Sequence, residues 1–215
     1  MSLPDFETVA ARADLCRLLA ACYYEPGPEW AEERLFDAMI EAAQGLDPGL
    51  GAEALELKTA HAGADGEELL VDYAKLFLGP GATLAPPYES AWRAQAGDVG
   101  GESTQALIEL YDSGGFELDP DFRDLPDHVA VELEFLYTLE FQLAASLKAN
   151  DGKAFEHAGT LRWALLNQHL GIWVDPFANA LGNHAVCDFY RQLGKFTSGF
   201  LTFELMNSPR TPASS

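Results

Sequence analysis

The polar residues whose spacing could support chemistry are grouped in the segment LPDHVAVELEFL, which contains Asp127, His128 and Glu132. Glu132 follows His128 by four residues, so on a helix the two side chains would share one face. A histidine oriented by a carboxylate can act as a general base. A small hydrolase-like enzyme that uses His128 is therefore one alternative. The sequence marks no nucleophile beside His128, however, so a peptide-binding polar cluster needs fewer assumptions. A well-formed helix start explains Asp127 and His128 equally well.

Metal and cofactor chemistry is not indicated elsewhere in the chain. A di-iron site in a helical bundle needs two Glu-x-x-His pairs. The residues three positions before the five histidines are Lys58, Leu125, Ala154, Leu166 and Leu181, and none is glutamate. The three cysteines show no C-x-x-C spacing, and the H-E-x-x-H, Walker and G-x-S-x-G motifs are absent. We therefore predict no catalytic residue, no metal and no cofactor.

A second group of candidate residues lies in a Pro- and Gly-rich segment from Gly79 to Gly101. Loops of this length inside a compact domain are uncommon, and they are usually functional or disordered. This one contains Tyr88 and Trp92, aromatic residues that a merely flexible linker would not need. We predict an ordered binding loop with a short helix over residues 89–94.

Two other pairs of residues have a structural interpretation that is more typical than a functional one. His169 and Trp173 lie one helical turn apart in NQHLGIWVDPF, a spacing that suits a packed helix–helix corner. Tyr23 and Tyr24 precede a proline at the end of a predicted helix, where aromatic rings commonly close the helix end against the core.

Helices must position all of these residues. The apolar residues of segment 125–150 recur at helical spacing and cover most of the circumference, which predicts a central helix in a bundle. Pro126 suits the first turn of that helix, and Asp127 would place negative charge at the positive end of its dipole. We expect further helices over residues 6–24, 28–44, 67–78, 103–111, 153–170, 172–181 and 185–206, with a shorter one that ends near residue 61. No convincing strand pattern is present, so we predict a single all-α domain over residues 1–215 with a frayed tail at 207–215.

The composition excludes several classes of protein. The chain has 215 residues, 48% of them hydrophobic, which is enough to bury a full core. It carries 13 Lys and Arg against 34 Asp and Glu, for a net charge of −21. Such a surface repels nucleic acid and anionic membranes and attracts basic partners, although acidity alone could simply maintain solubility. No apolar run is long enough to cross a bilayer and no apolar leader opens the chain, so we expect a soluble, cytoplasmic protein.

Four segments together resemble a known family. The order and spacing of LFLGPGATLAPPYESAW, LPDHVAVELEFL, NQHLGIWVDPF and HAVCDFYRQLGKF are similar to those of the TorD/DmsD branch of the molybdoenzyme assembly chaperones, to which NarJ is a more distant relative. The resemblance runs from about residue 12 to residue 203. It implies an all-helical chaperone without a prosthetic group, which binds the twin-arginine signal peptide and the apo form of a molybdopterin oxidoreductase. Such a chaperone aids cofactor insertion and holds back export.

The resemblance also implies which residues bind the peptide. They are Tyr88, Glu89 and Trp92 from the loop, Asp127 and His128 from the start of the central helix, and Tyr23 or Tyr24 as an aromatic wall. Glu89 suits a leader arginine, because a carboxylate can accept two parallel guanidinium hydrogen bonds. A general helical adaptor that binds another amphipathic or basic peptide is the alternative outside this family. Domain-swapped dimers occur in the family, and the sequence leaves monomer and dimer open.

Overall fold

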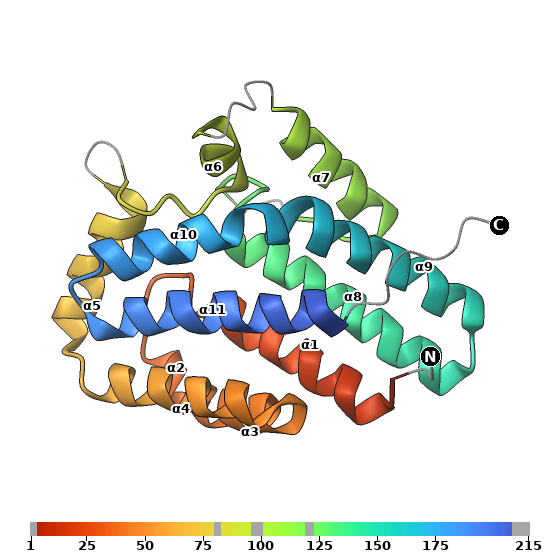
Figure 1. Cartoon of the computed structure of the whole chain (residues 1–215), viewed down its shortest axis with the longest axis horizontal. Coiled ribbons are helices and arrows are strands. Elements are labelled where there is room, and N and C mark those ends of the chain that lie inside the picture. Colours follow the sequence, from red (N-terminus) through yellow and green to blue (C-terminus); the bar gives the residue numbers. More distant parts are fainter. Residues whose placement is uncertain (1–3, 80–82, 96–100, 119–122, 208–215) are drawn as a thin grey trace.

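The computed structural model describes residues 4–79, 83–95, 101–118 and 123–207. Within these ranges the chain is helical and contains no β-strand, which confirms the predicted all-α fold (Figure 1). None of the described helices is long and apolar enough to cross a membrane.

The helices follow one another closely along the chain. Their bounds are Phe6–Ala21 (α1), Glu29–Glu32 (α2), Leu35–Leu46 (α3), Pro48–Ala62 (α4), Gly66–Tyr73 (α5), Glu89–Gln95 (α6), Glu102–Ser113 (α7), Val129–Ala149 (α8), Gly152–Ala164 (α9), Gly171–His184 (α10) and Asp188–Asn207 (α11). Two π-helical segments extend this set: Ala74–Leu78 (η1) continues α5, and Leu165–Leu170 (η2) joins α9 to α10.

Side chains with short polar groups fix several of the helix ends. Asp47 and Asp65 each accept backbone N–H groups at the starts of α4 and α5, and Asp151 does the same for α9. Asn150 closes α8 in the left-handed conformation, with a φ of 53°, which asparagine tolerates better than most residues. The polar residues between the apolar segments therefore set where the chain turns.

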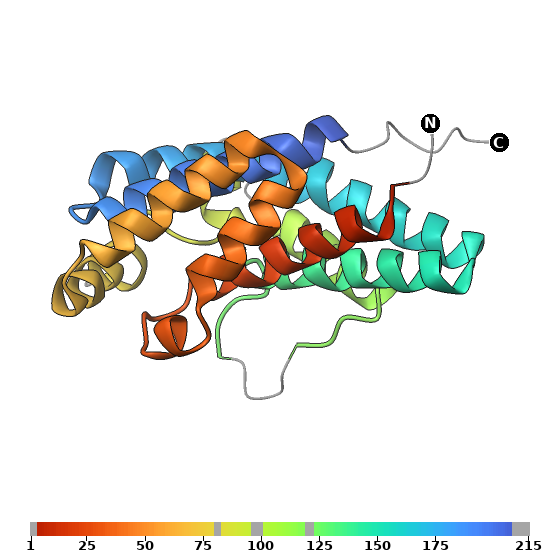
Figure 2. The same ribbon diagram turned by 90° about the horizontal axis from the view of Figure 1, so that it is seen from below.

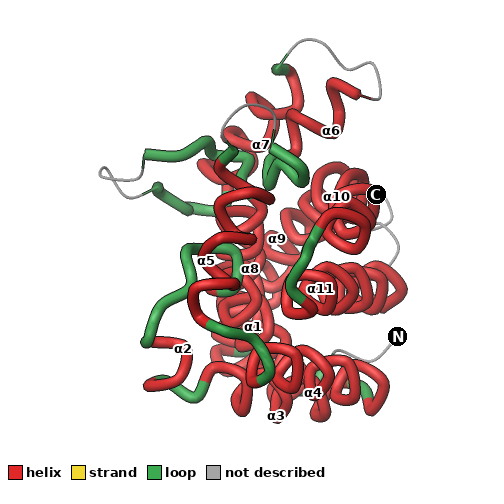
Figure 3. Tube along the Cα trace, turned by 90° about the vertical axis from the view of Figure 1, so that its left-hand side faces the viewer, coloured by secondary structure: helices red, strands yellow, loops and turns green. Residues whose placement is uncertain are grey.

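The helices form two layers. In Figure 3, α10, α11 and α4 lie one above another, and α8 and α1 lie beside them. Figure 2 shows α1 running alongside α8 and α4 running alongside α11. Helix α8 also packs against α9 and η2, and Val131, Leu133, Phe135, Leu136 and Leu139 on its different sides are all fully buried. The prediction of a central helix is confirmed.

The start of this central helix differs from the prediction. Helix α8 begins at Val129, with His128 as its N-cap, so Pro126 and Asp127 precede the helix rather than form its first turn. His128 has extended backbone angles, and it pairs with Tyr88 in an isolated β-bridge. Backbone pairing with a distant segment therefore holds the residues before Val129 in an extended conformation.

Other boundaries also differ. The helix expected over residues 28–44 is interrupted by Arg34, whose φ of 53° separates α2 from α3. The shorter helix expected to end near residue 61 is α4, which starts at Pro48, and the helix expected over residues 172–181 is α10, which continues to His184. The short helix predicted at 89–94 is present as α6. Parts of the predicted binding loop, residues 80–82 and 96–100, and the tail after Asn207 lie outside the described residues.

Candidate functional site

The segment before α6 lies against the segment before α8. The backbone N–H of Val129 donates to the carbonyl of Pro87 at 2.8 Å, and that of Glu89 donates to the carbonyl of Asp127 at 3.0 Å. These bonds bring the loop residues and the polar helix start together, as the peptide-binding hypothesis requires. The polar side chains of these two segments also have partners within the chain.

Asp127 and His128 each cap one helix. The Oδ2 atom of Asp127 accepts the N–H of Ser90 at 2.8 Å, at the start of α6, while Nδ1 of His128 accepts the N–H of Ala130 at 3.1 Å, at the start of α8. Both residues are buried. Burial lowers the pKa of His128, against the opposing influence of Asp124 and Asp127. The ring is therefore neutral, with its proton on Nε2 and its Nδ1 committed to the cap.

Glu132 does not orient His128. Its side chain is fully buried, and its Oε1 atom accepts a hydrogen bond from Nε1 of Trp173 at 3.1 Å. Burial, together with the negative charges of Glu89 and Asp127, raises the pKa of Glu132 well above its usual value. The alternative of an acid–base pair formed by His128 and Glu132 is thus not supported, because each side chain serves a different structural contact. The described residues also contain no group of His, Cys, Asp and Glu side chains that could hold a metal ion.

Glu89 is fully buried and already paired within the chain. Its carboxylate forms an ion pair with Arg93 one turn later on α6, and it lies 2.9 Å from Nδ1 of His169 in η2. Arg93 also donates to the carbonyl of Gln168. These contacts fasten α6 to η2, so in this conformation the Glu89 carboxylate is not presented to a ligand in solution.

His169 and Trp173 are the residues whose importance the sequence reasoning underestimated. They were expected to pack at a helix–helix corner, and they are buried between helices, but they also supply the buried polar partners of Glu89 and Glu132. Both belong to the NQHLGIW segment. The signal in the sequence that pointed to them was the family resemblance, which combines this segment with the loop and helix-start segments. Their one-turn spacing alone gave no indication of a partner.

The two adjacent tyrosines have different environments. Tyr23 is in the core, where its hydroxyl lies 2.6 Å from Oγ1 of Thr197 and its ring packs on Phe177. Tyr24 is exposed at the surface. Trp92 is partly buried, with Nε1 donating to the carbonyl of Pro86 at 2.8 Å. Tyr23 thus lies in the interior, and Trp92 mainly holds the loop in place.

An aromatic cluster of Tyr24, His128 and Tyr88 is the part of the predicted site that reaches the surface. The ring of Tyr24 stacks on the imidazole of His128, with centroids 6.1 Å apart and an angle of 8° between the planes. The ring of Tyr88 meets the same imidazole edge to face at 5.4 Å. Three segments of the chain, from the end of α1, the loop and the start of α8, therefore build one surface feature.

Acidic side chains border the aromatic cluster. The hydroxyl of Tyr24 donates to Oε1 of Glu134 at 2.8 Å, and the hydroxyl of Tyr88 donates to Oδ1 of Asp124 at 2.8 Å. Burial, reinforced by these carboxylates, raises the pKa of both tyrosines, so they stay protonated. Leu125, which is 51% exposed, directly follows Asp124. Aromatic faces beside carboxylates can bind a guanidinium or ammonium group, and the exposed leucine adds an apolar contact.

Comparisons with known proteins agree on one family. Residues 43–179 match the family model described as the nitrate reductase delta subunit. The chain is 28% identical over 180 residues to the Tat proofreading chaperone DmsD of Salmonella typhi, covering 83% of this chain and 81% of that protein. It is 29% identical over 158 residues to the selenate reductase assembly chaperone protein of Thauera selenatis, covering 73% and 79% of the two chains.

One further relative and one solved structure are also similar to this chain. The chain is 32% identical over 138 residues to the chlorate reductase assembly chaperone protein of Ideonella dechloratans, covering 63% of this chain and 62% of that one. A solved structure of an Archaeoglobus fulgidus protein has the same fold, with a TM-score of 0.51, 20% identity and coverage of 89% and 93%. Because the family model matches residues 43–179 and similar proteins include the chaperones DmsD and TorD, the chain belongs to the nitrate reductase delta subunit family, in its TorD and DmsD group of reductase assembly chaperones.

Proposed function

We propose that this protein is a client-specific assembly chaperone for the catalytic subunit of a molybdopterin-dependent reductase. It binds the twin-arginine signal peptide and the apo form of its client, aids cofactor insertion and delays export until maturation is complete. Because the leader must be recognised before export, the chaperone acts in the cytoplasm. The names of the relatives, which include chlorate and selenate reductase assembly chaperones and a Tat proofreading chaperone, support this role.

The observation that carries the proposal is the acid-bordered aromatic cluster. Tyr24 and Tyr88 offer ring faces, and Glu134 and Asp124 offer carboxylates, next to the exposed Leu125. A leader arginine can stack its planar guanidinium on a tyrosine and hydrogen-bond a carboxylate at the same time. The net charge of −21 also attracts a basic peptide over a longer range.

This assignment gives the binding residues two kinds of role. Tyr24, Tyr88, Asp124 and Glu134 contact the peptide. The buried residues Glu89, Asp127 and His128 and the partly buried Trp92, which the resemblance places in the site, hold the loop and the α8 start in the binding geometry. The arrangement supports binding rather than catalysis, because the buried His128 is a helix cap and not a free base.

The test is calorimetry with the twin-arginine leader peptide of a molybdopterin-dependent reductase. The twin-arginine peptide should bind, and its affinity should weaken as salt is raised because the contacts are electrostatic. A peptide in which both arginines are lysine keeps the charge and loses the planar fork, so it should bind more weakly. Equal binding of the two peptides at every salt concentration would contradict a guanidinium site and leave only a nonspecific or apolar one.

A further inference from the structure

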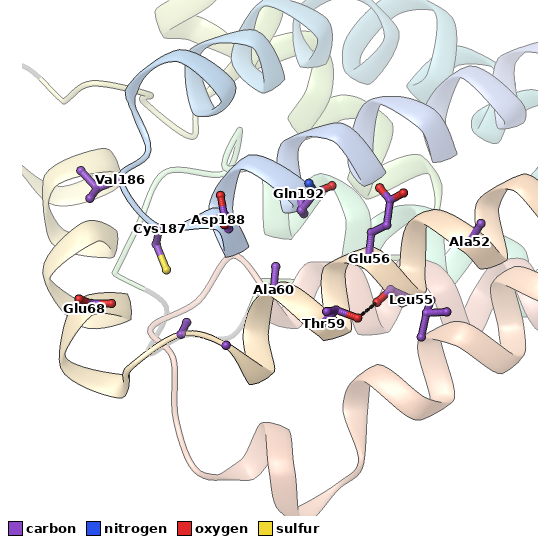
Figure 4. Close-up of a pocket in the computed structure, with 12 residues that line it drawn as sticks. Ala52, Leu55, Glu56, Thr59, Ala60, Glu68, Val186, Cys187, Asp188 and Gln192 are labelled. Atoms are coloured by element: carbon purple, nitrogen blue, oxygen red, sulfur yellow. Dashed lines mark hydrogen bonds between the residues drawn. The ribbon is translucent and has the colours of Figure 1, made fainter.

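A groove separate from the aromatic cluster lies between α4 and the start of α11. It has a volume of about 790 Å³, and residues from α4, α5 and the turn before α11 line it (Figure 4). None of the residues assigned above to leader binding lines this groove. The proposed function therefore leaves this surface unexplained.

The floor of the groove is one face of α4. Ala52, Glu56, Ala60 and Gly63 recur at steps of four, four and three, so they face the same side of the helix, whereas Leu50, Ala54 and Leu57 face the core. The face extends for about 17 Å at the rise of an α-helix. Three of its four residues have side chains no larger than a methyl group, which lets a second helix approach closely, since the distance between packed helices depends on the side chains at the contact.

The rim of the groove is apolar in places. Leu55 is 53% exposed on α4, and Val186 is 73% exposed in the turn before α11. In Figure 4 the two side chains stand toward opposite ends of the groove. Isolated exposed apolar residues need no explanation, but two such residues on the rim of one groove provide anchor points for an apolar helix face.

The charge of the groove is negative. Its lining includes Glu56, Glu68 and Asp188 and contains no lysine or arginine. Lys195 pairs with Glu56 at 2.6 Å and Arg191 pairs with Asp188, but these carboxylate side chains are still 53% and 74% exposed. Exposed ion pairs of this kind are weak, so a cation from a partner can replace Lys195, whereas Arg191 is also held by the carbonyls of Ala185 and Val186.

We propose that this groove is a second docking surface, which binds an amphipathic basic helix of a partner protein. The apolar face of that helix would lie on the small residues of α4 between Leu55 and Val186. Lysine or arginine residues on its flanks would meet Glu56, Glu68 and Asp188. This inference stands independently of leader binding, because it involves different residues and a helical rather than a guanidinium-centred ligand.

The test uses a fluorescent model peptide of about 16 residues, roughly four helical turns, with leucine and alanine on one face and lysine on the other. Anisotropy measures its binding to the whole chain, and amide NMR shifts locate it. We expect shifts in α4 and the start of α11, and weaker binding as salt is raised. A scrambled peptide and an analogue with glutamate in place of lysine should both fail to bind.

Two variants of the protein separate this groove from other acidic surfaces. Ala60→Trp fills the floor, and the double substitution Glu56→Lys with Glu68→Lys reverses the charge; each should weaken binding by roughly tenfold or more. The matched control, Glu102→Lys with Glu109→Lys, makes the same change of net charge on exposed positions of α7 and should keep most of the affinity.

The inference would be overturned by no binding to the wild-type chain, by binding that both groove variants retain, or by NMR shifts confined to the aromatic cluster. Self-association of the chain that Ala60→Trp abolishes would instead identify a second copy as the occupant and would also reject the proposal. Thermal melts check that each variant is folded. If Ala60→Trp does not fold, the double charge variant carries the test.

Discussion

The carboxylate of Glu89 lies 2.9 Å from Nδ1 of His169, eighty residues away in sequence, and both side chains are buried. With Arg93 as the second partner of Glu89, this contact joins α6 to η2. Glu89, which the sequence suggested as the partner of an arginine from a client, therefore forms its ion pair with an arginine of its own helix. Its main contribution is to the geometry of the loop.

Glu89→Gln should destabilise the protein by about 3 kcal/mol. Removing one partner of a buried ion pair leaves the other charge uncompensated, which typically costs about 3–5 kcal/mol, and the partial exposure of Arg93 puts this case at the low end. Urea denaturation measures the change. The control is Glu102→Gln, on an exposed position of α7, which should change stability by less than about 0.5 kcal/mol. An unchanged midpoint for Glu89→Gln would show that the pair contributes nothing net to folding.

The core of α8 supports a second prediction. Leu136 is fully buried in the middle of the helix, so Leu136→Ala should leave a cavity and cost about 2–5 kcal/mol. Phe141 lies on the same helix and is 60% exposed, so Phe141→Ala should stay within about 0.5 kcal/mol of the wild type. Chemical denaturation of the two variants under the same conditions compares them directly. Similar losses in both would mean that α8 is not oriented as described.

These residues show which features the sequence could predict. The apolar spacing of Val129, Leu133 and Leu136 is local information, and it predicted a central helix correctly. The start of α8 depends on backbone bonds from Val129 to Pro87 and from Glu89 to Asp127, about forty residues apart. No local pattern encodes such pairing. The helix start was therefore placed too early in the chain.

For the same reason, the sequence predicted only part of the candidate site. The family resemblance brought Tyr88, Asp127 and His128 into one hypothesis, and the structure does bring them together. Which of their polar atoms already have internal partners depends on tertiary contacts. Glu89 and His169 illustrate this, because neither one's sequence neighbourhood indicates the other. Similarly, the sequence did not indicate which of Tyr23 and Tyr24 faces the core.

The cap formed by His128 predicts a specific dependence on pH. The cap needs a neutral ring, because Nδ1 accepts the N–H of Ala130, and burial lowers the pKa of His128 below its usual 6.5. The folded state thus takes up a proton less readily than the unfolded state. The stability that the neutral ring contributes is complete above pH 6.5 and is lost as the pH falls below 6.5 toward the lowered pKa.

His128→Asn tests this dependence, since asparagine is a good N-cap that does not titrate. Denaturation at a series of pH values between about 8 and about 5 should show the wild type losing its advantage over the variant as the imidazole becomes charged. Glu132 has a raised pKa and acts in the opposite direction, but it is present in both proteins and cancels in the comparison. Parallel pH profiles for the two proteins would exclude His128 as the titrating group.

The last prediction concerns the exposed faces of the aromatic cluster, on which the proposed function rests. Tyr24→Ala and Tyr88→Ala should each weaken binding of the twin-arginine leader by about 0.5–2 kcal/mol, the range for a lost contact between a cation and an aromatic ring. Tyr24→Phe keeps the ring and removes the hydroxyl that donates to Glu134, so it should retain most of the affinity. Phe141→Ala removes an exposed aromatic residue of α8 and serves as the matched control.

Calorimetry with the leader peptide, accompanied by thermal melts, distinguishes binding from folding. The tyrosine variants should melt close to the wild type, because their rings are only partly buried, and should lose affinity without any loss of helix content. The His128→Asn variant separates the cap from the ring: it keeps the α8 start but removes the imidazole on which Tyr24 and Tyr88 pack. Wild-type affinity in Tyr24→Ala, Tyr88→Ala and His128→Asn together would show that the aromatic cluster is structural and that the leader binds elsewhere on the chain.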